Sequence, residues 1–238
     1  MTPEPATVAG SVPAGPVTEP GLVIEPGLVA EPGPVTKPGP SPSAGSSDRL
    51  ARATFTVLFV CTGNTYRSPL AERLLAARLG PGTGVRVGSA GTKAPWGEGM
   101  DRATRAVLTG LGGDAEGFRP RLLTAELVAG ASLVLGLERE HREAAVRLVP
   151  VALRRCFTLK EFVRLAEGDE GPGQGLDVVA RAAARRGTVC APRPADDDIA
   201  DPWGEPYEVL RRCGEDIDAL AVRLAALLSA ERGTAVPL

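Results

Sequence analysis

Residues 55–60 read Phe-Thr-Val-Leu-Phe-Val, a short and almost wholly apolar stretch that a polar loop, residues 61–68, follows at once. A run of this length and composition is typical of a strand buried on both faces, as the strands of parallel sheets are. Ser68 and Pro69 suit the N-cap and the first position of a helix, and residues 69–79 continue with helix-forming residues. The segment therefore predicts a strand, a loop and a helix in succession, the unit from which parallel α/β folds are built.

The same alternation of strand and helix patterns continues along the chain. Further strands are predicted at residues 85–89, 131–137 and 149–151, and helices at residues 100–110, 138–148, 176–186 and 207–230. This order favours a single three-layer α/β domain, in which a four-stranded parallel sheet carries helices on both faces. Residues 163–195 have a less regular pattern, and we expect them to form an insertion beside the sheet.

Proline and glycine set the first fifty residues apart from the rest. Of the 22 prolines, 11 lie at or before Pro42, and a hexad that begins Glu-Pro-Gly repeats from Glu19, Glu25 and Glu31. Dense proline prevents helix and central strand, and such a segment has too few large apolar residues for a core. We expect residues 1–50 to be a disordered tail that acts as a spacer. The alternative is a tail whose proline-rich sequence binds an SH3-like partner. Residues 51–238 are expected to form the domain.

Composition excludes several classes of protein. The 27 basic and 29 acidic residues nearly balance, which argues against a protein that binds nucleic acid by bulk charge, and no apolar run is long enough to span a membrane. The four cysteines contain no C-x-x-C pair, and the single histidine, His141, is expected to be solvated on its charged helix. We therefore expect a cytoplasmic protein without a metal site or disulfide framework.

The loop after the first strand, Cys61-Thr-Gly-Asn-Thr-Tyr-Arg67, carries the chemistry. Backbone N–H groups of a tight strand-to-helix loop converge, and the helix N-terminus adds positive potential, so the loop predicts an anion cradle. Gly63 eases the turn, and Arg67 can grip two phosphate oxygens at once. The same field favours the Cys61 thiolate, which is then placed to attack phosphorus, and the Ser68 hydroxyl can bond the sulfur.

A leaving group needs a proton donor, and the acidic loop near residue 200 offers candidates. Four aspartates lie in the sequence Asp-Asp-Asp-Ile-Ala-Asp-Pro-Trp, residues 196–203, and spacing alone does not choose among them. Trp203 is a candidate for a pocket wall. The plain alternatives are a buried structural cysteine, a solvated acidic loop, and a phosphate-binding adaptor without turnover.

The loop resembles that of the low-molecular-weight protein tyrosine phosphatases, whose pattern is Val-Cys-x-Gly-Asn-x-Cys-Arg-Ser-Pro, with Asp-Pro-aromatic near the C-terminus. Residues 89–92, Ser-Ala-Gly-Thr, are similar to that family's motif at its second strand. The resemblance covers residues 54–230 and implies the four-stranded fold, no metal or other cofactor, a cysteinyl-phosphate intermediate and a phosphorylated protein as substrate. Arsenate reductases use a related loop but need two further cysteines close together.

The resemblance also implies a role for each matching residue. Cys61 resembles the nucleophile, Arg67 the phosphate clamp, and Asp201 the general acid that later activates water, which selects it among the four aspartates. Asn64 resembles the residue that holds the loop's strained shape, Ser89 its partner, and Ser68 the hydroxyl that stabilises the thiolate. The substrate-binding residues implied are Thr62, Gly63, Asn64, Thr65, Tyr66, Ser68 and Trp203.

The sequence departs from the family pattern at several positions. Tyr66 replaces the second loop cysteine, so the protective disulfide cannot form, and Phe118 stands where a histidine often supports the asparagine. Thr65 in place of isoleucine, and Gly204 after Trp203, resemble the protein arginine phosphatase branch. Phosphotyrosine is the favoured substrate and phosphoarginine the alternative.

Overall fold

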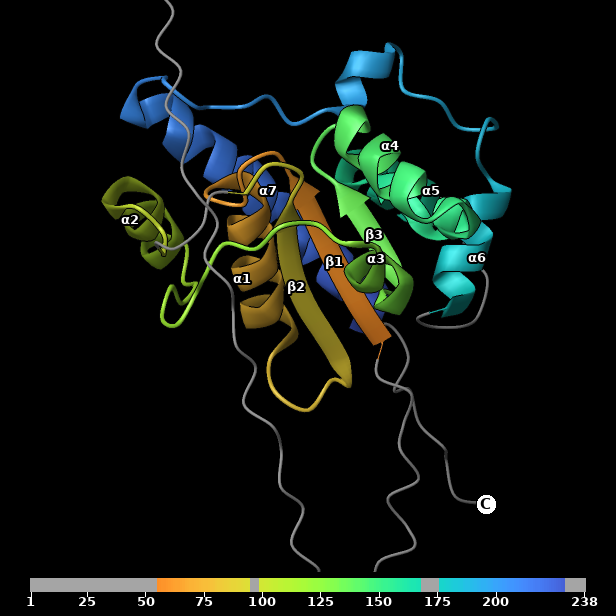
Figure 1. The fold of residues 1–238 in the computed structure, drawn as a ribbon, viewed down its shortest axis with the longest axis horizontal. Helices are drawn as coiled ribbons and strands as arrows, with labels where there is room; N and C mark the ends of the chain where they lie inside the picture. Colours follow the sequence, from red (N-terminus) through yellow and green to blue (C-terminus); the bar gives the residue numbers. More distant parts are fainter. Residues whose placement is uncertain (1–54, 95–98, 168–175, 230–238) are drawn as a thin grey trace, which may run out of the picture. The chain divides into compact units, whose positions relative to one another are not determined.

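Four parallel strands form one sheet in the order β2-β1-β3-β4, with β1, the strand predicted first, in its interior (Figure 1). The computed structural model describes residues 55–94, 99–167 and 176–229, so the predicted tail lies outside the described residues. The elements in order are β1 Phe55–Cys61, α1 Arg67–Leu79, β2 Val85–Gly91, α2 Arg102–Gly110, α3 Ala125–Gly130, β3 Leu133–Gly136, α4 Arg139–Leu148, the 3₁₀-helix η1 Pro150–Arg155, β4 Cys156–Thr158, α5 Leu159–Glu167, α6 Leu176–Ala184, the 3₁₀-helix η2 Pro194–Asp197 and α7 Tyr207–Ser229. The predicted three-layer α/β fold is confirmed.

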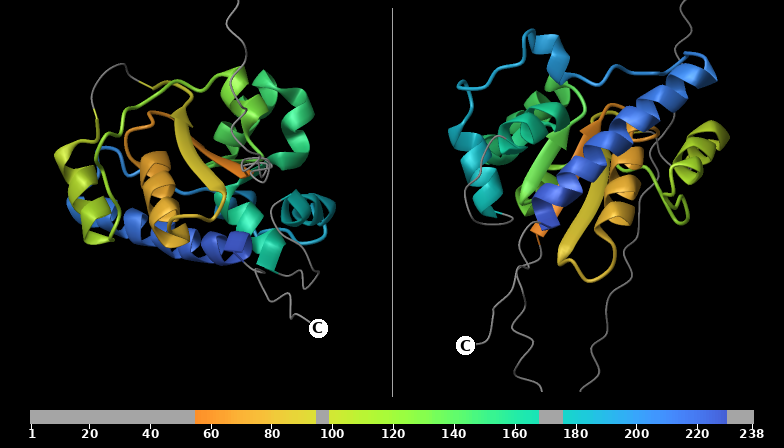
Figure 2. Two further views of the ribbon diagram at one scale, coloured as in Figure 1. Left: turned by 90° about the horizontal axis from the view of Figure 1, so that it is seen from below. Right: turned by 180° about the vertical axis from the view of Figure 1, so that it is seen from behind.

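Alternate residues of the central strands face opposite layers of helices. Val57 and Phe59 of β1 pack with α1, α5 and α7, whereas Leu58 and Val60 pack with α3 and α4. Figure 2 shows these two sets of helices on opposite faces of the sheet. All four side chains are buried, which explains why β1 reads as a continuous apolar run rather than an alternating one.

The register brings three chain segments together at the carboxyl edge of the sheet. Cys61, the last residue of β1, lies opposite Gly91 of β2, and Val60 lies opposite Gly136 of β3. In open parallel sheets this edge, beside the crossover between neighbouring strands, is where ligands bind. The Cys61 loop therefore begins at the position that the fold reserves for a site.

The fourth strand lies later in the chain than predicted. Pro150 opens η1 instead, since its fixed φ and missing N–H suit the first turn of a helix, and Val151 is 84% exposed. The strand is Cys156–Thr158, which is buried in full but too short to predict by pattern. The prediction of a strand at residues 149–151 was wrong.

The start of α1 also differs from the prediction. The helix begins at Arg67 with Tyr66 as its N-cap, so Ser68 is inside the first turn and Pro69 is its third residue. Proline is tolerated there because the N–H groups of a first turn have no partner within the helix. The Ser68 hydroxyl is consequently free to turn toward the loop rather than to cap the helix.

Candidate active site

The loop between β1 and α1 is held in a conformation that few residues adopt. Asn64 has a positive φ of 50°, the one non-glycine residue with positive φ in the described chain. Gly91 of β2 packs directly beneath it, where a Cβ atom would lie 2.6 Å from the Thr62 carbonyl oxygen and 2.8 Å from the Asn64 nitrogen. The loop therefore depends on a glycine of the neighbouring strand as well as on its own residues.

The Asn64 side chain uses all its hydrogen-bonding groups within the protein. Its amide nitrogen donates to Ser89 Oγ at 2.8 Å and to Ser68 Oγ at 2.9 Å, and its oxygen accepts from the Arg121 backbone N–H at 2.9 Å. Ser89 in turn donates to Glu72 at 2.5 Å, and burial raises the pKa of that carboxyl. A fully bonded buried network of this kind fixes the loop in one shape.

Cys61 lies at the base of the loop with two groups directed at its sulfur. Ser68 Oγ is 2.9 Å from Sγ, and the Asn64 backbone N–H donates to Sγ over 3.2 Å. Because Ser68 Oγ already accepts from the Asn64 amide, its own proton is free to point at the sulfur. Both contacts suit a sulfur that carries negative charge.

Arg67, whose side chain is 2% exposed, stands between two carboxylates. Its Nη1 donates to the Ile199 carbonyl at 2.9 Å and lies 3.0 Å from Glu138, while Nη2 donates to Asp201 at 2.7 Å. Arg67 is the first residue of α1, and its guanidinium is thus held by Glu138, before α4, and by the segment of Ile199 and Asp201, before α7. An arginine so fixed presents its remaining N–H groups in a constant direction.

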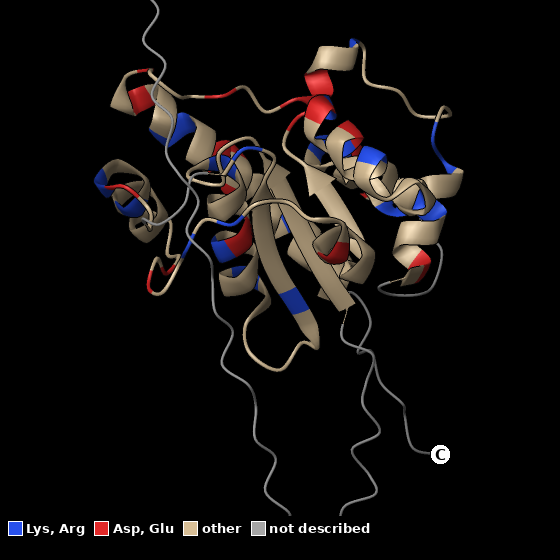
Figure 3. Cartoon of the chain, in the orientation of Figure 1, with Lys and Arg blue, Asp and Glu red and all other residues tan. Residues whose placement is uncertain are grey.

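The structure distinguishes among the four aspartates that spacing left open. All four are described residues: Asp196 pairs with Arg193, Asp197 with Arg164 and Asp198 with Arg139. Asp201 is the one that lines a cavity with Cys61 and reaches Arg67. The acidic stretch that carries them runs along the edge of the domain toward α7 (Figure 3).

The cavity above the sulfur has a volume of about 320 Å³. Residues of the Cys61–Arg67 loop line it together with Trp203, which is 80% exposed. Its walls are formed by both polar and apolar side chains, so it suits an extended side chain that ends in an anion. The lining residues are Cys61, Thr62, Gly63, Thr65, Tyr66, Arg67, Asp101, Asp201, Pro202, Trp203 and Leu210.

Comparisons with known proteins agree with this geometry. Residues 56–171 match the family model described as low molecular weight phosphotyrosine protein phosphatase. A protein-arginine-phosphatase of Geobacillus stearothermophilus is 35% identical over 178 residues, which cover 75% of this chain and 99% of the relative. The chain belongs to the low molecular weight phosphotyrosine protein phosphatase family. As a member, the phosphatase is a hydrolase that acts on phosphorylated proteins through a cysteine.

One tyrosine phosphatase of the family matches over a shorter stretch of sequence. The Escherichia coli K12 protein named low molecular weight protein-tyrosine-phosphatase Etp is 39% identical over 112 residues, which cover 47% of this chain and 74% of the relative. Among solved structures, the YwlE arginine phosphatase of G. stearothermophilus has a TM-score of 0.54 at 34% identity, covering 72% of this chain and 90% of that one. The T. tengcongensis tyrosine phosphatase has a TM-score of 0.55 at 32% identity, covering 71% and 97%.

Two departures from the family pattern have visible consequences in the phosphatase. Tyr66 is buried and its hydroxyl donates to the Leu210 carbonyl, which ties the loop to α7, and burial raises its pKa. The Phe118 ring lies under the Arg73 guanidinium, 5.6 Å from the ring centroid, and has no polar group to bond Asn64. The support that a histidine would supply to Asn64 comes from the Arg121 backbone instead.

His141 is buried, so the prediction that it is solvated was wrong. Its side chain is 1% exposed, because the first turn of α4 packs it against the sheet and the loop. Burial and the charge of Arg67 lower its pKa to about 4, so the imidazole is neutral at ordinary pH. Sequence reasoning also missed Glu138 and Arg121. Of the two, only Glu138 carried a signal, since it lies two residues after β3 at the carboxyl edge of the sheet.

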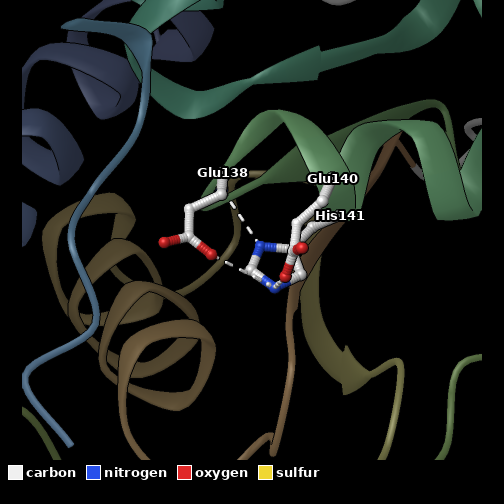
Figure 4. Close-up of side chains that lie close together, drawn as sticks. All are labelled: Glu138, Glu140 and His141. Carbon is white, nitrogen blue, oxygen red and sulfur yellow. Dashed lines mark hydrogen bonds and ion pairs between the residues drawn. The ribbon is translucent and has the colours of Figure 1, made fainter. Parts of the chain in front are cut away.

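His141 lies beside Glu138 and Glu140 in the one group of metal-ligating side chains that the described residues contain (Figure 4). The Glu138 backbone N–H donates to Nδ1 of His141 at 3.1 Å, so Nδ1 has no proton and Nε2 carries it. A protonated Nε2 offers no lone pair to a cation, although it faces both carboxylates. The donor set therefore does not fit a metal site.

No helix among residues 55–94, 99–167 and 176–229 is long and apolar enough to cross a bilayer.

Proposed function

We propose that the chain dephosphorylates proteins by covalent catalysis at Cys61. The thiolate attacks phosphorus, a sulfur–phosphorus bond forms, and the bond from phosphorus to the substrate oxygen breaks. The leaving oxygen takes a proton from the Asp201 carboxyl group, while Arg67 and the loop N–H groups hold the other phosphoryl oxygens. The observation that carries this proposal is the meeting of Cys61, Arg67 and Asp201 in one cavity.

The second step returns the enzyme to its starting state. Asp201, now a carboxylate, takes a proton from water, whose oxygen attacks phosphorus, and the sulfur–phosphorus bond breaks with its electron pair left on sulfur. The Ser68 hydroxyl, 2.9 Å from Sγ, stabilises the departing thiolate. Asn64, Ser89 and Gly91 act in both steps by keeping the loop in shape.

Phosphotyrosine is the substrate that the apolar part of the cavity supports. Tyr66, Trp203 and Leu210 provide surfaces on which a phenyl ring can pack while its phosphate reaches Cys61. The family model and relatives such as Etp carry tyrosine phosphatase names. In this reading Thr65 is a small side chain of the wall.

Phosphoarginine is the second candidate, and two observations favour it. The arginine phosphatase relative aligns along 99% of its length, whereas Etp aligns along 74% of its own. The cavity also contains a hydroxyl and two carboxylates, Thr65, Asp101 and Asp201, which can hydrogen-bond a guanidinium. In this reading the bond that breaks joins phosphorus to nitrogen.

A side-by-side turnover assay on matched phosphotyrosine and phosphoarginine peptides decides between them, with Cys61→Ser as the control. Faster release of phosphate from phosphotyrosine supports the first substrate. Faster release from phosphoarginine moves the enzyme to the arginine branch and makes Thr65 the first residue to change. No Cys61-dependent release from either peptide overturns the catalytic proposal and favours a phosphate-binding adaptor.

The reducing cytoplasm is the proposed compartment, since the mechanism needs a free thiol and all four cysteines, each in the described chain, are free. We also propose that residues 163–195, of which 168–175 lie outside the described residues, are an insertion that shapes substrate access, and that residues 1–50 act as a spacer.

A further inference from the structure

His141 makes a hydrogen bond to the catalytic loop. Its Nε2 lies 2.9 Å from Oγ1 of Thr62, the residue that follows Cys61. Because Nδ1 accepts from the Glu138 backbone, Nε2 carries the proton and Thr62 Oγ1 must be the acceptor. Glu138 and Glu140 lie farther from Nε2, at 3.6 Å and 3.4 Å, so Thr62 is its nearest partner.

The hydrogen bond from His141 leaves the Thr62 hydroxyl able to donate its own proton. A hydroxyl that accepts a hydrogen bond from a neutral imidazole keeps its own proton, which then points away from the imidazole. Thr62 lines the cavity beside Cys61, so this proton is available to a group bound there.

Holding the backbone does not require this contact. The Thr62 carbonyl already accepts from Lys93 N–H at 2.9 Å, and the Cys61 carbonyl accepts from Thr92 N–H at 2.9 Å. Gly91 supports the loop from below. The imidazole is therefore placed to orient the Thr62 side chain rather than to hold its main chain.

We propose that the Thr62 hydroxyl donates a hydrogen bond to an oxygen of the bound phosphoryl group and that His141 is the positioning residue that orients it. The proposal rests on the proposed function, because the phosphoryl group must enter this cavity. It adds a side-chain donor, supported from α4, to the backbone N–H groups and Arg67.

Substitutions at Thr62 and at His141 separate the effect of the hydroxyl donor from that of the residue that orients it. Thr62→Val removes the hydroxyl at nearly constant shape, and Thr62→Ser keeps it. His141→Asn keeps an acceptor for the Glu138 N–H but does not reach Thr62, whereas His141→Gln restores an N–H group at the reach of Nε2. A hydrogen bond to a charged group predicts that Thr62→Val lowers kcat/KM roughly 10-fold to 100-fold, and that Thr62→Ser, which keeps the hydroxyl, loses less.

A double-mutant cycle tests whether His141 acts through Thr62. His141→Asn should lower kcat/KM in the wild-type background, His141→Gln should recover part of the loss, and His141→Asn should cost little more once Thr62 is valine. An equal loss in both backgrounds overturns the proposal, because His141 then acts elsewhere.

Two further measurements do not depend on turnover. Calorimetry with inorganic phosphate should show weaker binding to Thr62→Val and His141→Asn; unchanged binding overturns the contact with the phosphoryl group even if the peptide assay finds no catalysis. Since His141 is the only histidine, nitrogen NMR of the untagged chain should show one neutral ring with its proton on Nε2. A proton on Nδ1 overturns the proposal even where a His141 variant does not fold.

Discussion

Asp201 and Arg67 are in contact although 134 positions separate them in the chain, and their ion pair joins the acid loop to the cradle. In the proposed mechanism a bound phosphate also needs N–H groups of Arg67, so we expect phosphate and Asp201 to compete for that side chain. We expect entry of substrate to loosen the Asp201 carboxylate and so to free it to take up and transfer a proton, as the proposed mechanism requires. The Arg67 guanidinium is thus a group that both Asp201 and a bound phosphate can contact.

Asp201→Ala should lower kcat on a peptide substrate by about 10²-fold to 10⁴-fold, the usual contribution of a general acid or base. Binding of inorganic phosphate should be unchanged or tighter, because Arg67 loses a competing carboxylate. Steady-state kinetics and calorimetry measure the two effects. Asp196→Asn, which alters an aspartate paired with Arg193 outside the cavity, is the matched control; an unchanged kcat in Asp201→Ala removes that residue from the mechanism.

Tyr66 predicts a distinctive response to oxidation. Tyrosine replaces the second loop cysteine, so a Cys61 oxidised by peroxide has no neighbouring loop thiol with which to form a disulfide. Over-oxidised, irreversible products should therefore accumulate. Recovery of activity with thiol should be slow and incomplete, whereas Tyr66→Cys should recover more fully. Tyr66→Phe, which loses only the hydroxyl bond to Leu210, should behave like the wild type. Fast and complete recovery of the wild type would contradict this prediction.

Three strands, β1, β2 and β3, contribute residues to the site at the carboxyl edge of the sheet. β1 delivers Cys61, β2 supplies Gly91 beneath the loop, and β3 leads into Glu138. Cys61 and Gly91 are paired in the register of the sheet, whereas Glu138 lies two residues beyond β3 as the N-cap of α4.

Gly91→Ala should disturb this edge. The added Cβ would lie 2.6 Å from the Thr62 carbonyl oxygen, and backbone atoms cannot move aside cheaply, so kcat/KM should fall at least tenfold and unfolding should occur at lower denaturant. Gly110→Ala, at the end of α2 with open space around it, should stabilise by about 0.5–1 kcal/mol and leave kcat/KM unchanged. Urea titration with parallel kinetics checks both, and a fully active Gly91→Ala would show that the loop tolerates displacement.

Burial of a neutral histidine links the stability of the whole domain to pH. The pKa of His141 is about 4 in the folded state against an ordinary value of 6.5, so the unfolded chain binds more protons between these values. Its contribution to stability is therefore complete above pH 6.5 and is lost as pH falls toward 4, by up to about 3 kcal/mol. The raised pKa values of Glu72 and Glu138 act in the opposite direction.

Comparison with His141→Asn isolates this term, since both carboxylates are common to the two proteins. The free energy of unfolding should be measured by urea titration at pH 7 and at pH 4.5. On lowering the pH from 7 to 4.5 it should decrease more in the wild type than in His141→Asn. Parallel pH dependence in the two proteins would contradict the buried neutral state.

Much of the fold and part of the site follow from local sequence. The buried strand β1, the loop with Cys61 and Arg67 and the helix after it are encoded in one short segment, whose apolar run and turn residues admit few conformations. The fourth strand was misplaced because three residues carry no periodic signal, and Pro150 marked a helical turn instead.

The choice of Asp201 from the four aspartates required the family resemblance at the sequence level, whereas in the structure their separate ion pairs distinguish them. The burial of His141 against Thr62 had no local signal at all. The strand–loop–helix unit, with Cys61 and Arg67 at the two ends of its loop, follows from local sequence alone. The contacts of Asp201 with Arg67 and of His141 with Thr62 appear only in the tertiary structure, because hydrogen bonds and burial depend on segments brought together from distant parts of the chain.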